Sequence, residues 1–284
     1  MKRARGAALV LVMWLVALLI ALIGAFAMSA RIEYMQGRTL SRGLVAEQAA
    51  RAGLEYAMTR VFDLEPATQW LPDGRAYDWA FNGMEVQVRL VDEAAKVDLN
   101  NADLNLLASL FRVVGAAPDA ATAVAAAIVD WRDSDSLSQP SGGAEDPQYA
   151  AAELPYGAKD APFDTVGEVE QVLGMTPALY EAVAEHLTVF SGQATPDQRF
   201  ASGEVLQALG VDPTAILAER ERNALMPGDG GIVGGGSGTY SIESRARLPD
   251  GRQAVLRAVV RAGPSGVPGS AYAPLRWEEG ATAR

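Results

Sequence analysis

The sequence contains no cysteine and a single histidine, and these absences exclude several kinds of chemistry. Without cysteine the protein has no disulfide framework, no thiolate metal ligand and no thiol nucleophile. The histidine, His186, lies in an apolar helical pattern with Val183 and Leu187. Because a general base needs positioned partners, we interpret His186 as a structural helix residue. We therefore predict that the protein is not an enzyme.

Charged side chains are absent from residues 7–30. About 20 helical residues cross the hydrocarbon core of a bilayer, so this run is long enough to span it. Lys2, Arg3 and Arg5 precede it, which predicts that the N-terminus stays in the cytoplasm and the rest is exported. An ordinary signal peptide cut after Ala27 is the alternative, but the apolar run is longer than the usual core of such signals.

Proline is absent before Pro66, and apolar residues recur at helical spacing from Ile32 to Val61. This pattern predicts one uninterrupted helix from Ala7 to about Phe62. At 1.5 Å per residue it would be roughly 85 Å long. We assign residues 7–65 to a transmembrane and spine segment, preceded by a leader of residues 1–6.

Strand periodicity occurs in two separate parts of the chain. Trp79–Asp92 alternates apolar and polar residues beside the hairpin signal Asn82-Gly83. Near the C-terminus, Thr239–Arg247 and Arg252–Ala262 flank a turn at Pro249-Asp250-Gly251. We therefore predict an antiparallel sheet built from residues 66–96 and 239–262, which are far apart in sequence.

The intervening residues 97–227 carry repeated helix start signals. The helices expected there are Ala102–Arg112, Pro118–Trp131, Val166–Leu173, Pro177–Phe190 and Gly203–Arg222. This organisation predicts an α+β fold: a long N-terminal helix, a head with an antiparallel sheet, and a large inserted all-α domain.

Two segments outside these elements are rich in glycine. Gly228–Gly238 contains seven glycines but no Gly-Lys-Ser/Thr sequence, so we interpret it as a flexible return linker and not as a phosphate-binding loop. The tail, residues 263–284, is expected to be mostly mobile. Within it, Tyr272, Leu275 and Trp277 are candidates for a short edge strand.

Carboxylates are concentrated in the segment 130–146, around the loop-forming run 138–143. The candidate metal ligands are Asp130, Asp133, Asp135, Glu145 and Asp146. Ca²⁺ takes six to eight oxygen ligands in irregular geometry, which suits this spacing. The pattern is not an EF-hand, because Leu137 stands where a third ligand is expected. A solvated acidic loop remains the alternative on spacing alone, and Glu153 and Asp160 are substitutes in the ligand set.

Nucleic acid is excluded as a partner by charge. The sequence has a formal net charge of −11, and residues 97–230 hold 21 acidic and 6 basic residues. Binding to phosphates depends on cationic contacts, so this segment would repel a duplex. The segment Val97–Ala102, similar to helix-hairpin-helix elements, is therefore interpreted as a packing device.

A basic leader ending in glycine, an apolar helix and an exported head together resemble the type IV pilins and pseudopilins. In that family a prepilin peptidase cuts after the glycine, which implies cleavage between Gly6 and Ala7. The fifth mature residue is usually glutamate, whereas this sequence has Leu11. A buried carboxylate in an apolar helix is costly, and a subunit at the end of a filament can dispense with it.

A series of separated motifs makes the resemblance more specific. In order along the chain they are Val97–Ala102, Ile128–Asp135, Gly143–Asp146, Tyr149, Pro155–Gly157, Ala161–Phe163 and Val172–Pro177. From the leader to about residue 262, the chain resembles the protein K family of type II secretion systems, the large minor pseudopilins. Its length of 284 residues fits this family.

The resemblance implies a minor pseudopilin at the tip of the pseudopilus, which starts or limits filament assembly for the export of folded proteins. It implies a pilin-like head in the periplasm, a single inner-membrane span and bound Ca²⁺ in the helical domain. Expected partners are minor pseudopilins I and J, the major pseudopilin, the inner-membrane secretion platform and the prepilin peptidase. The helix residues expected to mediate assembly are Leu9, Leu11, Leu15, Leu18, Leu19 and Leu22. The alternatives are a membrane-anchored calcium-binding protein or hydrolase, and a minor type IV pilin.

Overall fold

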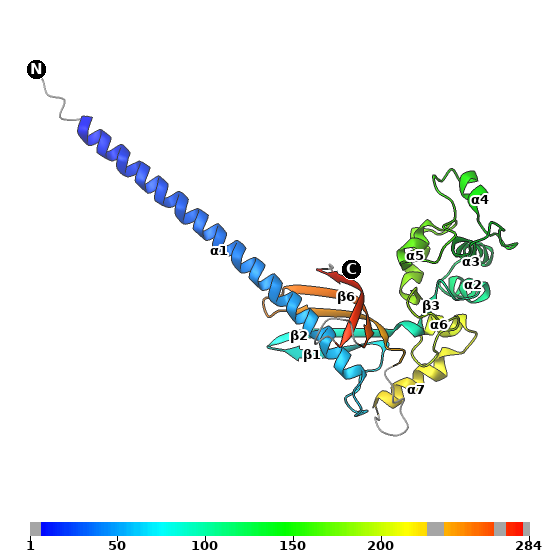
Figure 1. Cartoon of the computed structure of the whole chain (residues 1–284). Helices are drawn as coiled ribbons and strands as arrows, with labels where there is room; N and C mark the ends of the chain where they lie inside the picture. Colours follow the sequence, from blue (N-terminus) through cyan, green and yellow to red (C-terminus); the bar gives the residue numbers. More distant parts are fainter. Residues whose placement is uncertain (1–6, 226–235, 264–270, 281–284) are drawn as a thin grey trace, which may run out of the picture.

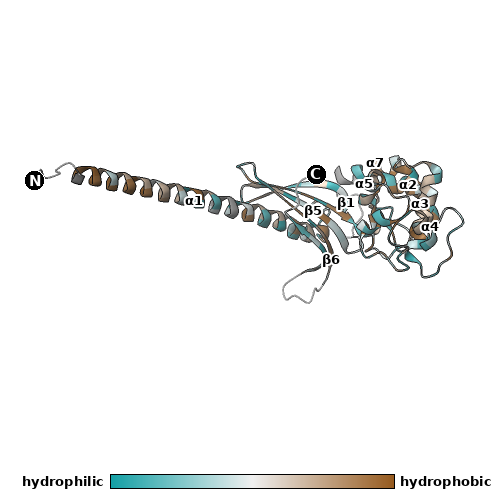
Figure 2. Cartoon of the chain, turned by 90° about the horizontal axis from the view of Figure 1, so that it is seen from above, coloured by the Kyte–Doolittle hydropathy of each residue, from teal (hydrophilic) through white to brown (hydrophobic). Residues whose placement is uncertain are grey.

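The computed structural model describes residues 7–225, 236–263 and 271–280. Its dominant feature is α1 (Ala7–Val61), a single helix of 55 residues. About half of α1 projects from the rest of the molecule, and the projecting end is the hydrophobic one (Figures 1 and 2). The C-terminal part of the same helix, with buried residues from Ala46 to Val61, lies against the sheet. The apolar segment, which packs against no other described part of the chain, and the segment packed in the head therefore belong to one continuous helix.

The head contains a five-stranded antiparallel sheet in the order β1-β2-β5-β6-β7. The strands are β1 (Asp73–Phe81), β2 (Met84–Asp92), β5 (Thr239–Arg247), β6 (Gln253–Ala262) and β7 (Tyr272–Glu279). β2 pairs directly with β5, so the sheet is assembled from both ends of the head sequence. The predicted α+β class with a discontinuous antiparallel sheet is confirmed.

Small residues bring α1 close to the sheet. Ala46, Ala49, Ala50 and Ala57 are all buried in the core between the helix and β2, β5 and β6. Gly53 lies so close to the sheet that a Cβ atom there would be 2.6 Å from Val86 Cγ1. The alanine and glycine face of α1 therefore permits an approach that larger side chains would prevent.

A second core belongs to the helical domain, which leaves the sheet after β2 and returns at β5 (Figure 1). Its elements are η1 (Glu93–Ala95), β3 (Val97–Asp98), α2 (Leu104–Val113), α3 (Pro118–Arg132), α4 (Asp146–Ala151), η2 (Val166–Gln171), α5 (Pro177–Val183), η3 (Ala184–His186), β4 (Leu187–Thr188), α6 (Gly203–Ala208) and α7 (Pro213–Leu225). β3 and β4 pair in parallel, which ties the start of the domain to a segment about ninety residues later.

Two buried carboxylates fasten the junction between the sheet and the helical domain. Asp92 accepts hydrogen bonds from the backbone N–H of Ala94 at 2.8 Å and of Ser237 at 2.6 Å. Glu93 accepts from Lys96 Nζ at 2.6 Å and also from the Thr188 hydroxyl. Both the outgoing and the returning chain are therefore held at the same place.

Three predicted helices need correction. The expected helix Val166–Leu173 is a 3-10 turn, η2, which ends before Gly174 with its φ of 86°. The expected helix Pro177–Phe190 ends at Val183, because the following residues form η3 and then pair with β3 as β4. Pairing with a distant strand has overridden the local helical pattern.

The expected helix Gly203–Arg222 is two helices, α6 and α7. Gly210 adopts a φ of 75° after α6, and Pro213 is the first residue of α7. The helical conformation is disfavoured for a residue that precedes proline, so the helix is interrupted at Asp212. The Asp212 carboxylate accepts from Thr214 N at 2.9 Å and starts the second helix.

Strand boundaries and the tail also differ from expectation. The hairpin turn expected at Asn82-Gly83 is confirmed, since these residues connect β1 to β2, but β1 begins at Asp73, before the expected Trp79. The edge strand suggested by Tyr272, Leu275 and Trp277 is confirmed as β7 (Tyr272–Glu279), so the expected mobility does not apply to this part of the tail. Most of the predicted glycine linker lies outside the described residues, and its end at Ser237 is fixed to Asp92.

Candidate functional site

The acidic segment lies where α3 ends and the chain loops back to α4. Asp133, Asp135 and Glu145 present carboxylate oxygens that all lie within 4.8 Å of one another. Oxygens bound to Ca²⁺ at 2.3–2.6 Å would be separated by up to about 5 Å. The cluster also lies at the C-terminal end of α3, where the helix dipole favours a cation. These three carboxylates therefore have the spacing of a calcium site.

Two oxygens in this cluster lack partners. Asp133 Oδ1 and Glu145 Oε1 are buried and accept no hydrogen bond from any described residue. Burial raises the pKa of Glu145 to about 7, and the neighbouring carboxylates of Asp130 and Asp160 add to this effect. Burial also raises the pKa of Asp133. A cation would satisfy the orphaned oxygens and offset the repulsion, so the donor set fits Ca²⁺.

Asp130 and Asp146, the other two predicted ligands, are not brought into this group. Asp130 is fully buried and accepts from Gln139 N at 3.1 and 3.2 Å, which closes the loop. Gly143 lies directly over this carboxylate, so a side chain there would collide with it. Asp146 begins α4, and its carboxylate lies against Gly157. Both residues shape the loop around the three clustered carboxylates.

A cluster of aromatic side chains packs beside the acidic loop. Trp131, two residues before Asp133, packs against Tyr149 with ring centres 5.8 Å apart and against Phe163 at 6.2 Å. Tyr149 is fully buried, and its hydroxyl accepts from Leu173 N at 3.1 Å. The loop is therefore fixed to the helical core, and Trp131 is a natural reporter of changes at the carboxylates.

The motif Val97–Ala102 has a structural role in the same domain. Asp98 is buried and accepts hydrogen bonds from Asn100 N, Ser191 Oγ and Gly192 N at 2.8 to 2.9 Å. Arg132 reaches this motif from the end of α3 and donates to the carbonyl of Ala102 at 2.6 Å. Its guanidinium is thereby used within the fold, and the structure agrees with the interpretation of this motif as a packing device.

The candidate assembly surface is the projecting half of α1. The leucines predicted to mediate assembly are Leu9, Leu11, Leu15, Leu18, Leu19 and Leu22, and their exposed fractions lie between 48% and 71%. The best apolar window of α1 has a mean hydropathy of 3.0, and none of it is buried. The predicted processing site lies at the edge of the structure: Gly6 is outside the described residues, and Ala7 is the first residue of α1.

His186 lies away from the acidic cluster, in the 3-10 turn η3 and not in an α-helix. Its Nδ1 atom is 3.1 Å from Ser202 Oγ, and burial lowers its pKa. The Ser202 hydroxyl also accepts from Val205 N at 3.3 Å as the N-cap of α6. Ser202 is thereby engaged as a helix cap.

Comparisons with known proteins show similarity to one family. The family model described as type II secretion system protein K matches residues 87–197, a segment that contains the acidic cluster. The chain is 28% identical over 213 residues to the type II secretion system protein K of Klebsiella pneumoniae. The chain is thus similar to the protein K family of type II secretion systems. The match to the Klebsiella protein covers 67% of this chain and 64% of that protein.

A solved structure shares the fold of this chain. A chain in the crystal structure of the GspK-GspI-GspJ complex from the type II secretion system of enterotoxigenic Escherichia coli matches with a TM-score of 0.60. The match covers 88% of this chain and all of the other, at 14% identity. At this identity the likeness establishes the fold alone.

Proposed function

We propose that the protein is a minor pseudopilin of a type II secretion system. In this role α1 anchors it in the inner membrane, and the head lies in the periplasm. The exposed apolar half of α1, joined to a protein K head, carries the proposal. A surface this apolar and extended needs a lipid or protein partner, and α1 is long enough to meet both in turn.

The same helix supports a place at the filament tip. Small and branched apolar side chains let transmembrane helices pack together by close contact. Leu11 stands where most pilins have glutamate, so this subunit offers no carboxylate to the amine of a subunit below it. The helical domain adds bulk to the head on the side away from the membrane segment (Figure 1). These features suit a cap that starts or limits pseudopilus growth.

Minor pseudopilins I and J are the proposed direct partners. The fold-related chain from Escherichia coli was crystallised with proteins of these two types. The major pseudopilin, the secretion platform and the prepilin peptidase follow from the same role. The function is mechanical: the tip primes the filament that moves folded proteins outward.

Calcium is the proposed cofactor, held by Asp133, Asp135 and Glu145. When bound, Ca²⁺ would supply positive charge and fix the position of oxygen ligands. The residues themselves provide the preformed frame: Asp130 closes the loop through Gln139, and Trp131 anchors it to the core. We infer a structural role for the ion.

Assembly with partners tests the proposal. The tagged full-length chain would be co-expressed with minor pseudopilins I and J of the same system and purified in detergent with Ca²⁺. We expect a stable ternary complex of equal stoichiometry by light scattering after gel filtration. The major pseudopilin in place of J provides the control for nonspecific association of apolar helices. A chain that elutes alone, or binds both combinations equally, would contradict a dedicated place in the tip complex.

A further inference from the structure

The two edges of the five-stranded sheet are built differently. β7, at one edge, contains Pro274, and its pairing with β6 shifts register between Val259 and Val260. Proline and irregular register are features that keep further strands from pairing with an edge. β1, at the other edge, has no proline, and after an irregularity at its start its register is continuous from Ala76 to Phe81 (Figure 1). The β1 edge is therefore the one suited to pairing with another strand.

The hairpin determines which backbone groups of β1 face outward. The two-residue turn Asn82-Gly83 places Phe81 directly opposite the first residue of β2. In such a hairpin the residues that flank the turn exchange both hydrogen bonds, and bonded and non-bonded pairs alternate from there. The residues whose N–H and C=O groups point away from β2 are therefore Ala76, Asp78 and Ala80. All three are exposed, and no described residue forms a backbone hydrogen bond with these outward groups.

One face of this edge is aromatic. Tyr77, Trp79 and Phe81 alternate with the outward residues and lie on the side of the sheet that packs on α1. Trp79 stacks on Tyr56 of α1 with ring centres 4.3 Å apart, and the Phe81 ring follows at 5.1 Å. Phe81 is still 37% exposed. An incoming strand would place every second side chain beside these rings, where β-branched residues pair well with aromatic ones.

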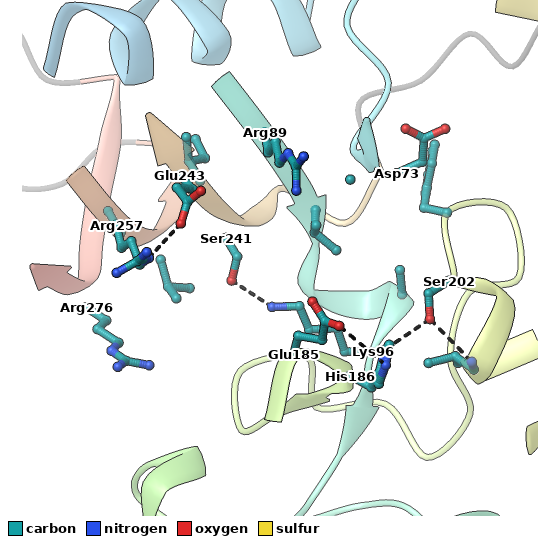
Figure 3. A pocket seen from close by; sticks show the side chains of 18 of the residues that line it. Asp73, Arg89, Lys96, Glu185, His186, Ser202, Ser241, Glu243, Arg257 and Arg276 are labelled. Carbon is teal, nitrogen blue, oxygen red and sulfur yellow. Dashed lines mark hydrogen bonds and ion pairs between the residues drawn. The ribbon is translucent and has the colours of Figure 1, made fainter. Parts of the chain in front are cut away.

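The other face of the edge carries negative charge. Asp78 is the one charged residue of the segment 76–81, and its carboxylate accepts from Gln87 Nε2 at 2.9 Å. The diagonal neighbours of Asp78 on β2 are Glu85 and Arg89, whose charges cancel. Arg89 is one strand further in, and Figure 3 shows it among the residues that line a cleft of about 490 Å³ at the helical domain. A basic side chain directly opposite Asp78 therefore suits this edge.

We propose that β1 binds an extended segment of another protein, which pairs with it in antiparallel orientation as a sixth strand. The ligand class is a polypeptide that alternates β-branched and polar residues and places Lys or Arg opposite Asp78. A second copy of the chain does not fit, because two β1 strands paired about Asp78 would bring like charges face to face. Main-chain hydrogen bonds give affinity, and the alternate side chains give specificity. This binding site goes beyond the proposed role in the pseudopilus tip and does not depend on it.

The peptide VTVKVT, blocked at both ends and labelled with a fluorophore, tests the main-chain pairing by anisotropy with the full-length protein in detergent. When its lysine lies opposite Asp78, the lysine N–H points at β1 and the N–H of the preceding valine points away. We expect N-methylation of the lysine to weaken binding by about tenfold, and N-methylation of that valine to leave binding unchanged. The variant A80P removes an outward N–H of β1 but none that pairs with β2. It should weaken binding and keep the thermal midpoint of the parent.

Charge reversal tests the side-chain pairing. The parent should prefer VTVKVT to VTVEVT, and D78K should weaken binding of VTVKVT about fivefold and reverse this preference. E181K, at an exposed position on α5 in the helical domain, is the matched control and should change neither affinity. Failure of VTVKVT to bind, equal binding of the two N-methylated peptides, or an unchanged preference in D78K would overturn the proposal. Dimerisation of the parent that A80P abolishes would also overturn it, because β1 would then pair with a second copy.

Discussion

Substitution of Gly53 by alanine tests the packing of α1 on the sheet. The new Cβ would lie 2.6 Å from Val86 Cγ1 and 3.1 Å from Val88 Cγ2, and it would also collide with the Ser244 hydroxyl. All three neighbours are almost completely buried on β2 and β5. Since they belong to paired strands, the contact cannot be relieved by rotating a flexible surface side chain.

The expected magnitude follows from two opposing contributions. Overpacking of a core typically costs about 1–3 kcal/mol, whereas alanine in place of glycine favours a helix by up to about 1 kcal/mol. We therefore expect G53A to lower the free energy of unfolding by about 1–2 kcal/mol. For a protein of this size that corresponds to a thermal midpoint lower by about 2–8 °C.

The matched control is G43A on the same helix, where a Cβ meets nothing within 4 Å. Only the helix preference acts there, so the midpoint should be unchanged or higher. Thermal unfolding of both full-length variants in detergent, followed by circular dichroism, gives the comparison. A G53A protein as stable as G43A would refute the close approach of α1 to the sheet.

Three further predictions concern the helical domain. Ca²⁺ should raise the thermal midpoint of the protein and change the fluorescence of its tryptophans, Trp131 among them. The variants D133N and D135N should each bind calcium roughly tenfold or more weakly, as measured by titration calorimetry. Without calcium, burial raises the pKa of Glu145 to about 7. The contribution of Glu145 to stability is therefore present below pH 4.5 and lost as the pH rises through 7. E145Q should reduce this pH dependence of stability, measured by unfolding at a series of pH values. D98A removes an acceptor of several hydrogen bonds in a buried site, and chemical denaturation should show a loss of about 3 kcal/mol or more.

Local sequence patterns correctly predicted the helix α1 and the hairpin between β5 and β6. The long helix α1 follows from the absence of proline and charge near the N-terminus, and its start at Ala7 and end at Val61 lie close to the expected limits. The hairpin between β5 and β6 follows from the turn residues Pro249 and Gly251. The family resemblance, carried by motifs in register, is confirmed by the family match.

Features set by distant contacts were not predictable in this way. Leu187 and Thr188 continue a helical pattern, but their backbone pairs with Val97 and Asp98. Nothing near Ser237 in sequence indicates that it binds Asp92. For the acidic segment, spacing supplied the candidates, but folding decided that Asp130 turns inward to Gln139 while other carboxylates cluster.

The mature N-terminus is the most direct test of the pseudopilin proposal. The first residue of the membrane-bound protein would be determined by mass spectrometry in cells with and without the prepilin peptidase. We predict a start at Ala7 that depends on the peptidase. A start after Ala27 that is independent of the peptidase would mean that an ordinary signal peptide is removed, and it would contradict the account of α1 as an assembly helix.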